Sequence, residues 1–366
     1  MTSALGRRLA RRIAITGPIS IAEFMAEALG HPTLGYYRRA MPIGTAGDFI
    51  TAPEVSQMFG ELVGAWLAER WQAIGQPSPV RLVELGPGRG TLMADALRAT
   101  RSVSGFHAAL DLHLVEINTP LRAAQEAGLG IYKPTWHESF DNVPEGPLLL
   151  VANEFFDTLP VRQLEKTRQG WNERMIGLAP DDETLTFALS PGPSPFARLL
   201  PTALRERETE PGTIAEISTA SIDLGSRIAA RLAQNGGWAL IVDYGRDSPA
   251  VGATLQALRS HQPVDPLDRP GETDLTAHVD FAALAEAVRQ KGVRVFGPTG
   301  QGTFLARLGI ERRAEALKAR ANREQRAAID AALARLIAPE QMGTLFRVLA
   351  VGDDRSPAPA GFSDET

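Results

Sequence analysis

The sequence predicts an α/β fold: a doubly wound sheet with helices on both faces, an N-terminal helical region and an inserted β-rich lobe. Three observations support it. From Val80 onward, short apolar segments alternate with amphipathic helical segments, as in proteins with a parallel sheet. A glycine-rich turn follows the first apolar segment. After Leu159 a long stretch with two-residue alternation interrupts this order.

The first 76 residues predict helices joined by a loop that can cover a pocket. Ser20 and Glu23 have the spacing of a capping box, and apolar residues follow at helical intervals. A second helix is expected over about 56–74. The intervening segment 31–51 is rich in Gly, Pro and Tyr and carries Asp48, so we expect it to fold over a bound ligand.

The rest of the chain divides into a core, an insertion and a tail. We expect the core to span 77–158 and 236–352, the inserted lobe 159–235, and a disordered, proline-rich tail 353–366. Within the insertion, a helix at 222–234 would return the chain to the sheet. The core strands are expected at about 80–85, 111–117, 131–134, 147–152, 237–243, 303–308 and 345–351.

Composition excludes several classes of function. The 366 residues carry a net charge of −5, so bulk attraction to nucleic acid is not indicated. The absence of cysteine excludes disulfides and thiolate sites, and the six scattered histidines lack metal-ligand spacing. No apolar run is long enough for membrane insertion. We expect the protein in the cytoplasm if the host is bacterial and in the mitochondrial matrix if it is eukaryotic. The sequence allows a homodimer but does not decide the oligomeric state.

The most informative segment is the glycine turn that ends the strand at 80–85. Gly86, Gly88 and Gly90 alternate, with Pro87 between the first two, and Glu84 precedes them by two residues. The spacing differs from the dinucleotide pattern G-x-G-x-x-G. It resembles the first motif of S-adenosylmethionine (SAM) methyltransferases, in which glycines admit the amino-acid end of the cofactor. A nearby carboxylate can face its ammonium group. A plain strand–helix turn is the alternative interpretation.

Two further acids extend this interpretation. Glu116 ends the next strand, about 30 residues after the turn, where a carboxylate can accept both ribose hydroxyls. Glu138 follows the third strand, where methyltransferases commonly hold the adenine amino group with an acid. The glycine turn and Glu116 together predict an adenosine-containing ligand at the strand tips. The alternative for Glu116 is a solvated glutamate at a strand end.

A polar segment follows the strand at 147–152. The carbonyl of Asn153 can accept a hydrogen bond from the N–H of a methyl acceptor. Glu154 and Asp157 would share one face of a helix, and two acids beside a SAM pocket suggest a cationic substrate such as arginine. Asp243, at another strand tip, completes the candidate acidic pocket. Alternatively, the acids at 154 and 157 cap a helix and Asp243 is a turn residue.

Specific segments from about Ser20 to Val351 resemble the MidA family of bacterial and mitochondrial proteins. The matching segments are HPTLGYY, GDFITAPEVSQMFGELVG, VELGPGRGTLMAD, VEIN, NEFFDTLPVRQ, DYG and MGTLFRVLA. The resemblance implies a class I, Rossmann-like SAM methyltransferase fold and methylation of protein arginine. In mitochondrial members it implies symmetric dimethylation of the 49-kDa-type subunit of respiratory complex I. The segment QGTFLARLGI matches loosely and 178–210 does not match, which leaves the substrate open.

Three other functions compete with arginine methylation. The chain would serve as a non-enzymatic, SAM-binding assembly factor for complex I if it used the cofactor only structurally. A small-molecule N-methyltransferase is a second alternative, because the residues themselves do not show that the substrate is a protein. A nicotinamide-dependent dehydrogenase needs a third glycine at the Rossmann spacing, which the turn lacks.

Overall fold

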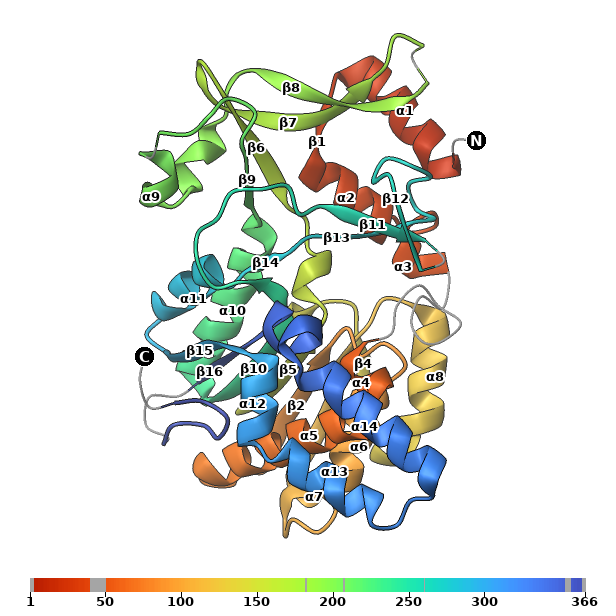
Figure 1. The fold of residues 1–366 in the computed structure, drawn as a ribbon, viewed down its shortest axis with the longest axis vertical. Coiled ribbons are helices and arrows are strands. Elements are labelled where there is room, and N and C mark those ends of the chain that lie inside the picture. Colours follow the sequence, from red (N-terminus) through yellow and green to blue (C-terminus); the bar gives the residue numbers. More distant parts are fainter. Residues whose placement is uncertain are drawn as a thin grey trace.

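The computed structural model describes residues 3–39, 51–181, 183–206, 208–259, 261–352 and 357–363. Figure 1 shows a lower lobe, in which helices surround a large sheet, and an upper lobe of N-terminal helices and smaller sheets. Within the described residues, no helix is both long and apolar enough to cross a membrane.

The lower lobe contains an eight-stranded sheet in the order β15-β16-β10-β5-β2-β3-β4, with β14 paired to β10. Its strands are β2 Val80–Leu85, β3 Leu110–Val115, β4 Thr135–His137, β5 Leu148–Asn153, β10 Gly237–Arg246, β14 Val279–Asp280, β15 Arg294–Gly300 and β16 Phe346–Gly352. Strand β2 pairs in parallel with both β3 and β5, so the chain order reverses there. Ligands bind at the carboxyl ends of strands at such a switch point.

Two apolar cores cover the two faces of this sheet. Leu82 belongs to one core and its neighbour Val83 to the other, because successive side chains of a strand point to opposite faces. The first face is covered by α5 Gln57–Ala73, α6 Thr91–Ala99, α7 Phe106–Ala109, α12 Gln301–Arg307, α13 Ile310–Lys318 and α14 Arg323–Ile337. The second face is covered by α10 Thr219–Asn235 and α11 Phe281–Arg289. The sheet is therefore doubly wound.

The upper lobe is assembled from three separated parts of the chain. Its five-stranded sheet contains β1 Ile19–Ser20, β6 Arg162–Thr167, β7 Gly170–Leu178, β8 Leu185–Pro193 and β9 Ile214–Ile217. A three-stranded sheet contains β11 Gln256–Arg259, β12 Gln262–Val264 and β13 Asp274–Thr276. The helices are α1 Ala4–Thr16, α2 Ile21–Gly30, α3 Tyr36–Arg39 and α9 Thr202–Arg205. One apolar core joins α1 and α2 to β7, β11 and β13. The insertion thus shares its lobe with the N-terminus, whereas α10 packs on the large sheet.

Two expected strands differ from the structure. The strand expected at 131–134 lies at β4, because Gly130–Tyr132 forms a short 3₁₀ helix. The segment 303–308 lies within and just after helix α12, and the strand before it is β15. Gly297 has a φ of 88° and precedes Pro298, and the pairing of β15 with β16 shifts register there. Glycine and proline are uncommon inside strands, so their presence here kept β15 from being predicted from the sequence.

Part of the expected disordered tail packs on the core. The indole N–H of Trp66 donates to the carbonyl oxygen of Ala360 (3.1 Å), and Arg70 Nη1 donates to that of Pro357 (2.7 Å). The ring of Phe362 lies 5.3 Å from that of Phe304, centre to centre. The segment therefore accepts hydrogen bonds from buried donors of α5. The expectation of disorder rested on amino-acid composition, which does not show such contacts.

We predict that Phe362→Ala lowers the free energy of unfolding by about 1–2 kcal/mol, because a half-buried ring leaves a space that its neighbours fill only partly. Urea unfolding followed by tryptophan fluorescence measures this change. Ile15→Ala is the control, since Ile15 is 84% exposed, and its expected change is within about 0.5 kcal/mol. Equal effects of the two variants would show that the C-terminal segment contributes no packing.

Candidate active site

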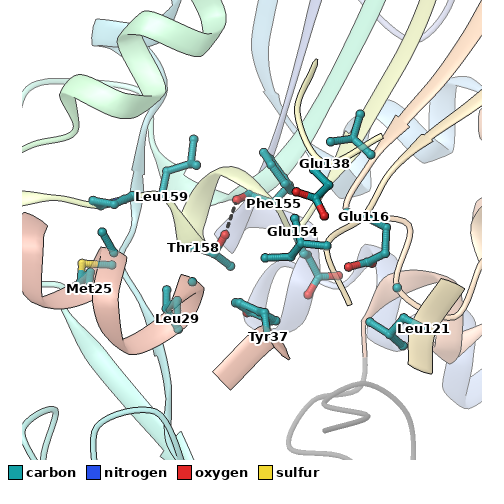
Figure 2. Close-up of a pocket in the computed structure, with 17 residues that line it drawn as sticks. Met25, Leu29, Tyr37, Glu116, Leu121, Glu138, Glu154, Phe155, Thr158 and Leu159 are labelled. Carbon is teal, nitrogen blue, oxygen red and sulfur yellow. Dashed lines mark hydrogen bonds between the residues drawn. The ribbon is translucent and has the colours of Figure 1, made fainter. Parts of the chain in front are cut away.

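A cavity of about 370 Å³ lies at the carboxyl edge of the large sheet, between the strand ends and residues of α2 and α3. Side chains from both lobes line it, as Figure 2 shows. Its lining consists of Met25, Ala26, Leu29, Gly30, Tyr37, Gly86, Gly88, Val115, Glu116, Ile117, Leu121, Glu138, Glu154, Phe155, Thr158, Leu159 and Pro160. Most of these residues are apolar, and the charged ones are carboxylates that come from strand tips.

The glycine turn forms one wall of this cavity. Gly86, Gly88 and Gly90 all have left-handed backbones, with φ values of 62°, 53° and 83°. A Cβ atom on Gly86 would lie 2.7 Å from Cδ2 of Phe155. The turn therefore needs glycine both for its conformation and for the close packing of Phe155. It leaves the main chain exposed to a ligand.

A second, smaller cavity of about 40 Å³ shares this wall. Glu84, Pro87, Asn153 and Glu154 are among its lining residues. The Oε2 atom of Glu84 and the Oδ1 atom of Asn153 are buried without a hydrogen-bond partner among the described residues. Burial, with the charge of Glu116, raises the pKa of Glu84 to about 8. Two acceptors without donors indicate a site for a ligand that carries N–H groups.

Glu116 is fixed at the tip of β3 by neighbouring donors. The N–H of Asn118 donates to its Oε1 (2.8 Å), and Gln125 Nε2 lies 3.4 Å from its Oε2. The same Nε2 atom donates to the carbonyl oxygen of Gly88 (2.6 Å), so Gln125 ties the glycine turn to the acid. Burial raises the pKa of Glu116. Glu116 lines the cavity, as its expected contact with a ribose requires.

Glu138 lies farther out on the same side. It lines the cavity, but its side chain is 66% exposed. Its Oε1 lies 3.8 Å from Nη1 of Arg38, which also donates to the carbonyl oxygen of Ile117 (2.9 Å). Arg38 belongs to α3 and thus links the upper lobe to the strand tips. A contact of Glu138 with adenine stays a proposal.

Glu154 occupies the centre of the site and lines both cavities. Its backbone is left-handed, with a φ of 50°, and its N–H donates to the carbonyl oxygen of Val242 (2.9 Å). Its Oε1 accepts from the N–H of Ala52 (2.9 Å) and from Asn153 Nδ2 (3.2 Å). Burial, reinforced by the charge of Asp157, raises the pKa of Glu154 to about 7. Strained backbones at non-glycine residues concentrate at functional sites.

Asp243 lies behind this segment and lines neither cavity. Its Oδ2 accepts from the N–H groups of Phe155 (3.1 Å), Phe156 (2.9 Å) and Asp157 (3.2 Å), and its Oδ1 accepts from that of Tyr244 (2.9 Å). Burial raises the pKa of Asp243, and nearby carboxylates add to this. Because its oxygens face the backbone, we propose that it positions the turn and does not contact the substrate.

Asp157 also differs from its expected position. The segment after Glu154 forms a short 3₁₀ helix, Phe156–Thr158, so Glu154 and Asp157 do not share the face of a longer helix. Asp157 is 5% exposed and lines neither cavity. Burial raises its pKa to about 6. We propose that the charge of Asp157 raises the pKa of Glu154 without contact with the ligand.

Sequence patterns missed one wall and could not place one residue. Asp48 lies outside the described residues. Met25 and Leu29 of α2 and Tyr37 of α3 line the cavity but were not among the expected site residues. The sequence did hold a signal for Tyr37, because it lies in the segment 31–51 that was expected to cover a pocket. For α2 there was none, since an apolar helix face usually packs in a core.

The comparisons with known proteins agree with this geometry. The model of a family described as S-adenosyl-L-methionine-dependent methyltransferases matches residues 62–299. The chain belongs to this family. It is 38% identical to "Protein arginine methyltransferase NDUFAF7 homolog, mitochondrial" of Drosophila melanogaster, over 95% of this chain and 84% of that protein. For "Protein arginine methyltransferase NDUFAF7, mitochondrial" of Danio rerio the identity is 36%, over 94% and 86%.

A solved structure extends the likeness to the whole fold. A COG1565 superfamily member from Burkholderia thailandensis, bound to S-adenosyl-homocysteine, superposes with a TM-score of 0.86 at 29% identity. The alignment covers 99% of this chain and 95% of that one. The methyltransferase therefore has the class I fold and uses SAM as its cofactor, and its resemblance to the MidA family is confirmed.

The residues of the site fit this cofactor. The ammonium group of SAM is a donor and a cation, and the unpartnered oxygens of Glu84 and Asn153 lie beside the glycine turn. Glu116 faces the larger cavity, where a ribose would present its hydroxyls. We propose that Glu84, Asn153 and Gly86 to Gly90 hold the amino-acid end and Glu116 the ribose.

We predict that Glu84→Gln stabilises the methyltransferase more at high pH than at low pH. The pKa of Glu84 is raised, so its stabilising contribution is complete below about 4.5 and is lost as the pH rises to about 8. Replacing the carboxyl by an amide removes this loss. The melting temperature of the variant should exceed that of the wild type by about 2–6 °C at pH 8.5 and by less at pH 5. A constant difference would contradict a raised pKa.

Asp243→Asn should destabilise the methyltransferase by about 2–4 kcal/mol, because the amide NH₂ group turns a donor toward backbone N–H groups. Chemical denaturation measures the change. Asp223→Asn is the control: its carboxylate is 67% exposed and pairs with Arg227 on the same helix, so about 0.5 kcal/mol is expected. If both variants unfold alike, the Asp243 carboxylate does not organise the turn.

Proposed function

We propose that this methyltransferase transfers the methyl group of SAM to a guanidinium nitrogen of a protein arginine. The observation that carries the proposal is Glu154, a buried carboxylate at the centre of the site that lines both cavities. The charge of Arg335 lowers the pKa of Glu154, but its effect is smaller than that of burial, and no ion pair within 4 Å joins Glu154 to an arginine or lysine of the described residues. A cationic substrate would supply the missing partner. The names of the curated relatives add support.

Charge complementarity favours a guanidinium in particular. Carboxylates surround the centre of the site, and burial raises the pKa of Glu154 and of Asp157 behind it. A planar guanidinium presents N–H groups that match a carboxylate with two parallel hydrogen bonds. Its binding would remove part of the free-energy cost of burying Glu154 as an anion.

The chemistry follows from the positions of Asn153 and Glu154. SAM supplies a methyl group on a sulfonium sulfur. The guanidinium stays protonated in water, so its attacking nitrogen needs its lone pair freed. We propose that Glu154 draws the positive charge away from that nitrogen, and that the Oδ1 atom of Asn153 aligns the cofactor's amino-acid end. As the N–C bond forms and the S–C bond breaks, the nitrogen releases one proton to Glu154, whose pKa of about 7 suits an acceptor.

The protein substrate follows less directly than the reaction. As the first candidate we propose an arginine of the 49-kDa-type subunit of respiratory complex I, modified by symmetric dimethylation. The family resemblance supports this candidate, and the relatives' names support a protein arginine as the methyl acceptor. For the compartment, we propose the cytoplasm in a bacterial host and the mitochondrial matrix in a eukaryotic one.

We predict that Glu154→Gln lowers kcat for arginine methylation at least about 100-fold, because the amide can neither localise the charge nor accept the proton. The measurement uses radiolabelled SAM and protein extract from cells that lack the gene, followed by amino-acid analysis for methylarginine. Binding of S-adenosylhomocysteine, followed by calorimetry, should persist. Glu126→Gln, an exposed change on α8 (Thr119–Leu129), is the control.

Two results would contradict the proposal. Wild-type activity of Glu154→Gln would remove the carboxylate from the reaction. Label found only on small molecules, with no methylarginine in any protein, would assign the chain to small-molecule methylation.

A further inference from the structure

The larger cavity has two sides of different chemistry. In Figure 2, Glu116, Glu138 and Leu121 lie on one side, Met25, Leu29 and Leu159 on the other, and Glu154, Phe155 and Tyr37 between them. The first side is made by the tips of β3 and β4 and by α8. It carries the carboxylates that fit an adenosine. If the cofactor's adenosine binds on the first side, the second side remains free for another ligand.

Helix α2 builds the second side. Met25, Ala26, Leu29 and Gly30 face the cavity from this helix, opposite the segment Thr158–Pro160. The side chains of all these α2 residues are uncharged, so this wall offers apolar contact.

Several contacts fix the position of α2. Its N-terminus is closed by a complete capping box of Ser20 and Glu23. Phe24, Met25, Ala28 and Leu29 are all buried in the core of the upper lobe, so of the α2 residues that line the cavity only Ala26 and Gly30 are more than slightly exposed. The N–H of Val161 lies 3.5 Å from the sulfur of Met25, which joins the helix to the segment across the cavity. The wall is therefore preformed.

Tyr37 completes the boundary between the two sides. Its hydroxyl lies 3.0 and 3.1 Å from the two carboxylate oxygens of Asp274, so the ring is held by β13. Burial beside Asp274 and Asp157 raises the pKa of Tyr37 well above its usual range, which keeps the hydroxyl protonated. A neutral, fixed ring beside Glu154 gives a guanidinium a face against which to stack.

We propose that the side of the cavity formed by α2 and Thr158–Pro160 is the entry channel for the substrate arginine, with α2 as its specificity-determining wall. This inference rests on the proposed function. The three methylene groups of arginine would lie along Ala26, Gly30 and Leu159, which line the cavity and keep accessible surface, and the guanidinium would reach Glu154. The channel selects a long unbranched apolar stem with a cationic end, because its wall is apolar and its inner end is a carboxylate.

Gly30 offers a sharp test of this channel. A Cβ atom added there meets no atom within 4 Å, and its φ is not in the left-handed region. A leucine side chain at this position would begin in open space at the cavity wall, and leucine favours the helix more than glycine does. Gly128 of α8 is the matched control: it is helical, exposed, equally free of neighbours and outside the cavity.

We predict that Gly30→Leu raises the apparent KM for protein substrate at least 10-fold, with the dissociation constant for S-adenosylhomocysteine changed less than twofold. Initial rates are measured with a dilution series of protein extract from cells that lack the gene, and cofactor binding is measured by calorimetry. Gly128→Leu should leave both values unchanged. Thermal melting of the variants confirms that each is folded.

Three outcomes would overturn the inference, and they are distinguishable. An unchanged KM in Gly30→Leu means that the arginine enters elsewhere. A matching loss of S-adenosylhomocysteine affinity means that α2 borders the cofactor. If the wild type binds S-adenosylhomocysteine but methylates no protein arginine, the proposed function fails and the inference fails with it.

Discussion

The site depends on one buried carboxylate that faces the backbone. Asp243 gathers the N–H groups of residues 155, 156, 157 and 244, so the chain turns sharply at the tip of β5. This turn holds Glu154 in a left-handed backbone conformation, which is strained because the residue is not glycine. The strain is tolerated because the surrounding hydrogen bonds determine the conformation. The position of Phe155 against Gly86 follows from the same turn, so the glycine turn and the acid segment fit together.

The second constraint is electrostatic. Glu84, Glu116, Glu154, Asp157 and Asp243 are gathered at one edge of the sheet, and burial raises the pKa of each. Such a cluster costs stability in the free protein, since buried carboxylates without cationic partners are unfavourable. Both ligands of an arginine methyltransferase are cationic: one carries an ammonium group and a sulfonium, the other a guanidinium. We propose that the cluster binds these two cations in adjoining spaces.

The sequence predicts the doubly wound sheet and much of the site because both depend on short-range patterns. Apolar runs followed by glycine or acid locate β2, β3, β5 and β10, and the same runs place Glu84, Glu116, Asn153 and Glu154 at one edge. The topology does the rest, since parallel strands bring their carboxyl ends together.

The remaining features depend on long-range contacts. Asp243 and Glu154 look alike in the sequence, but only the fold shows that one faces the backbone and the other the cavities. The role of α2 requires knowing which of its faces meets the sheet edge. Likewise, the C-terminal segment is polar and proline-rich, and it is ordered by Trp66 and Arg70, which lie far away in the chain.

The most direct measurement is a crystal structure of the protein with S-adenosylhomocysteine and an arginine-containing peptide. The account predicts the cofactor's amino group at Glu84 and Asn153, its ribose at Glu116, and the guanidinium on Glu154, with the arginine stem along α2. Adenosine bound along α2, or a guanidinium bound away from Glu154, would contradict the assignment of the acidic cluster to these two cations.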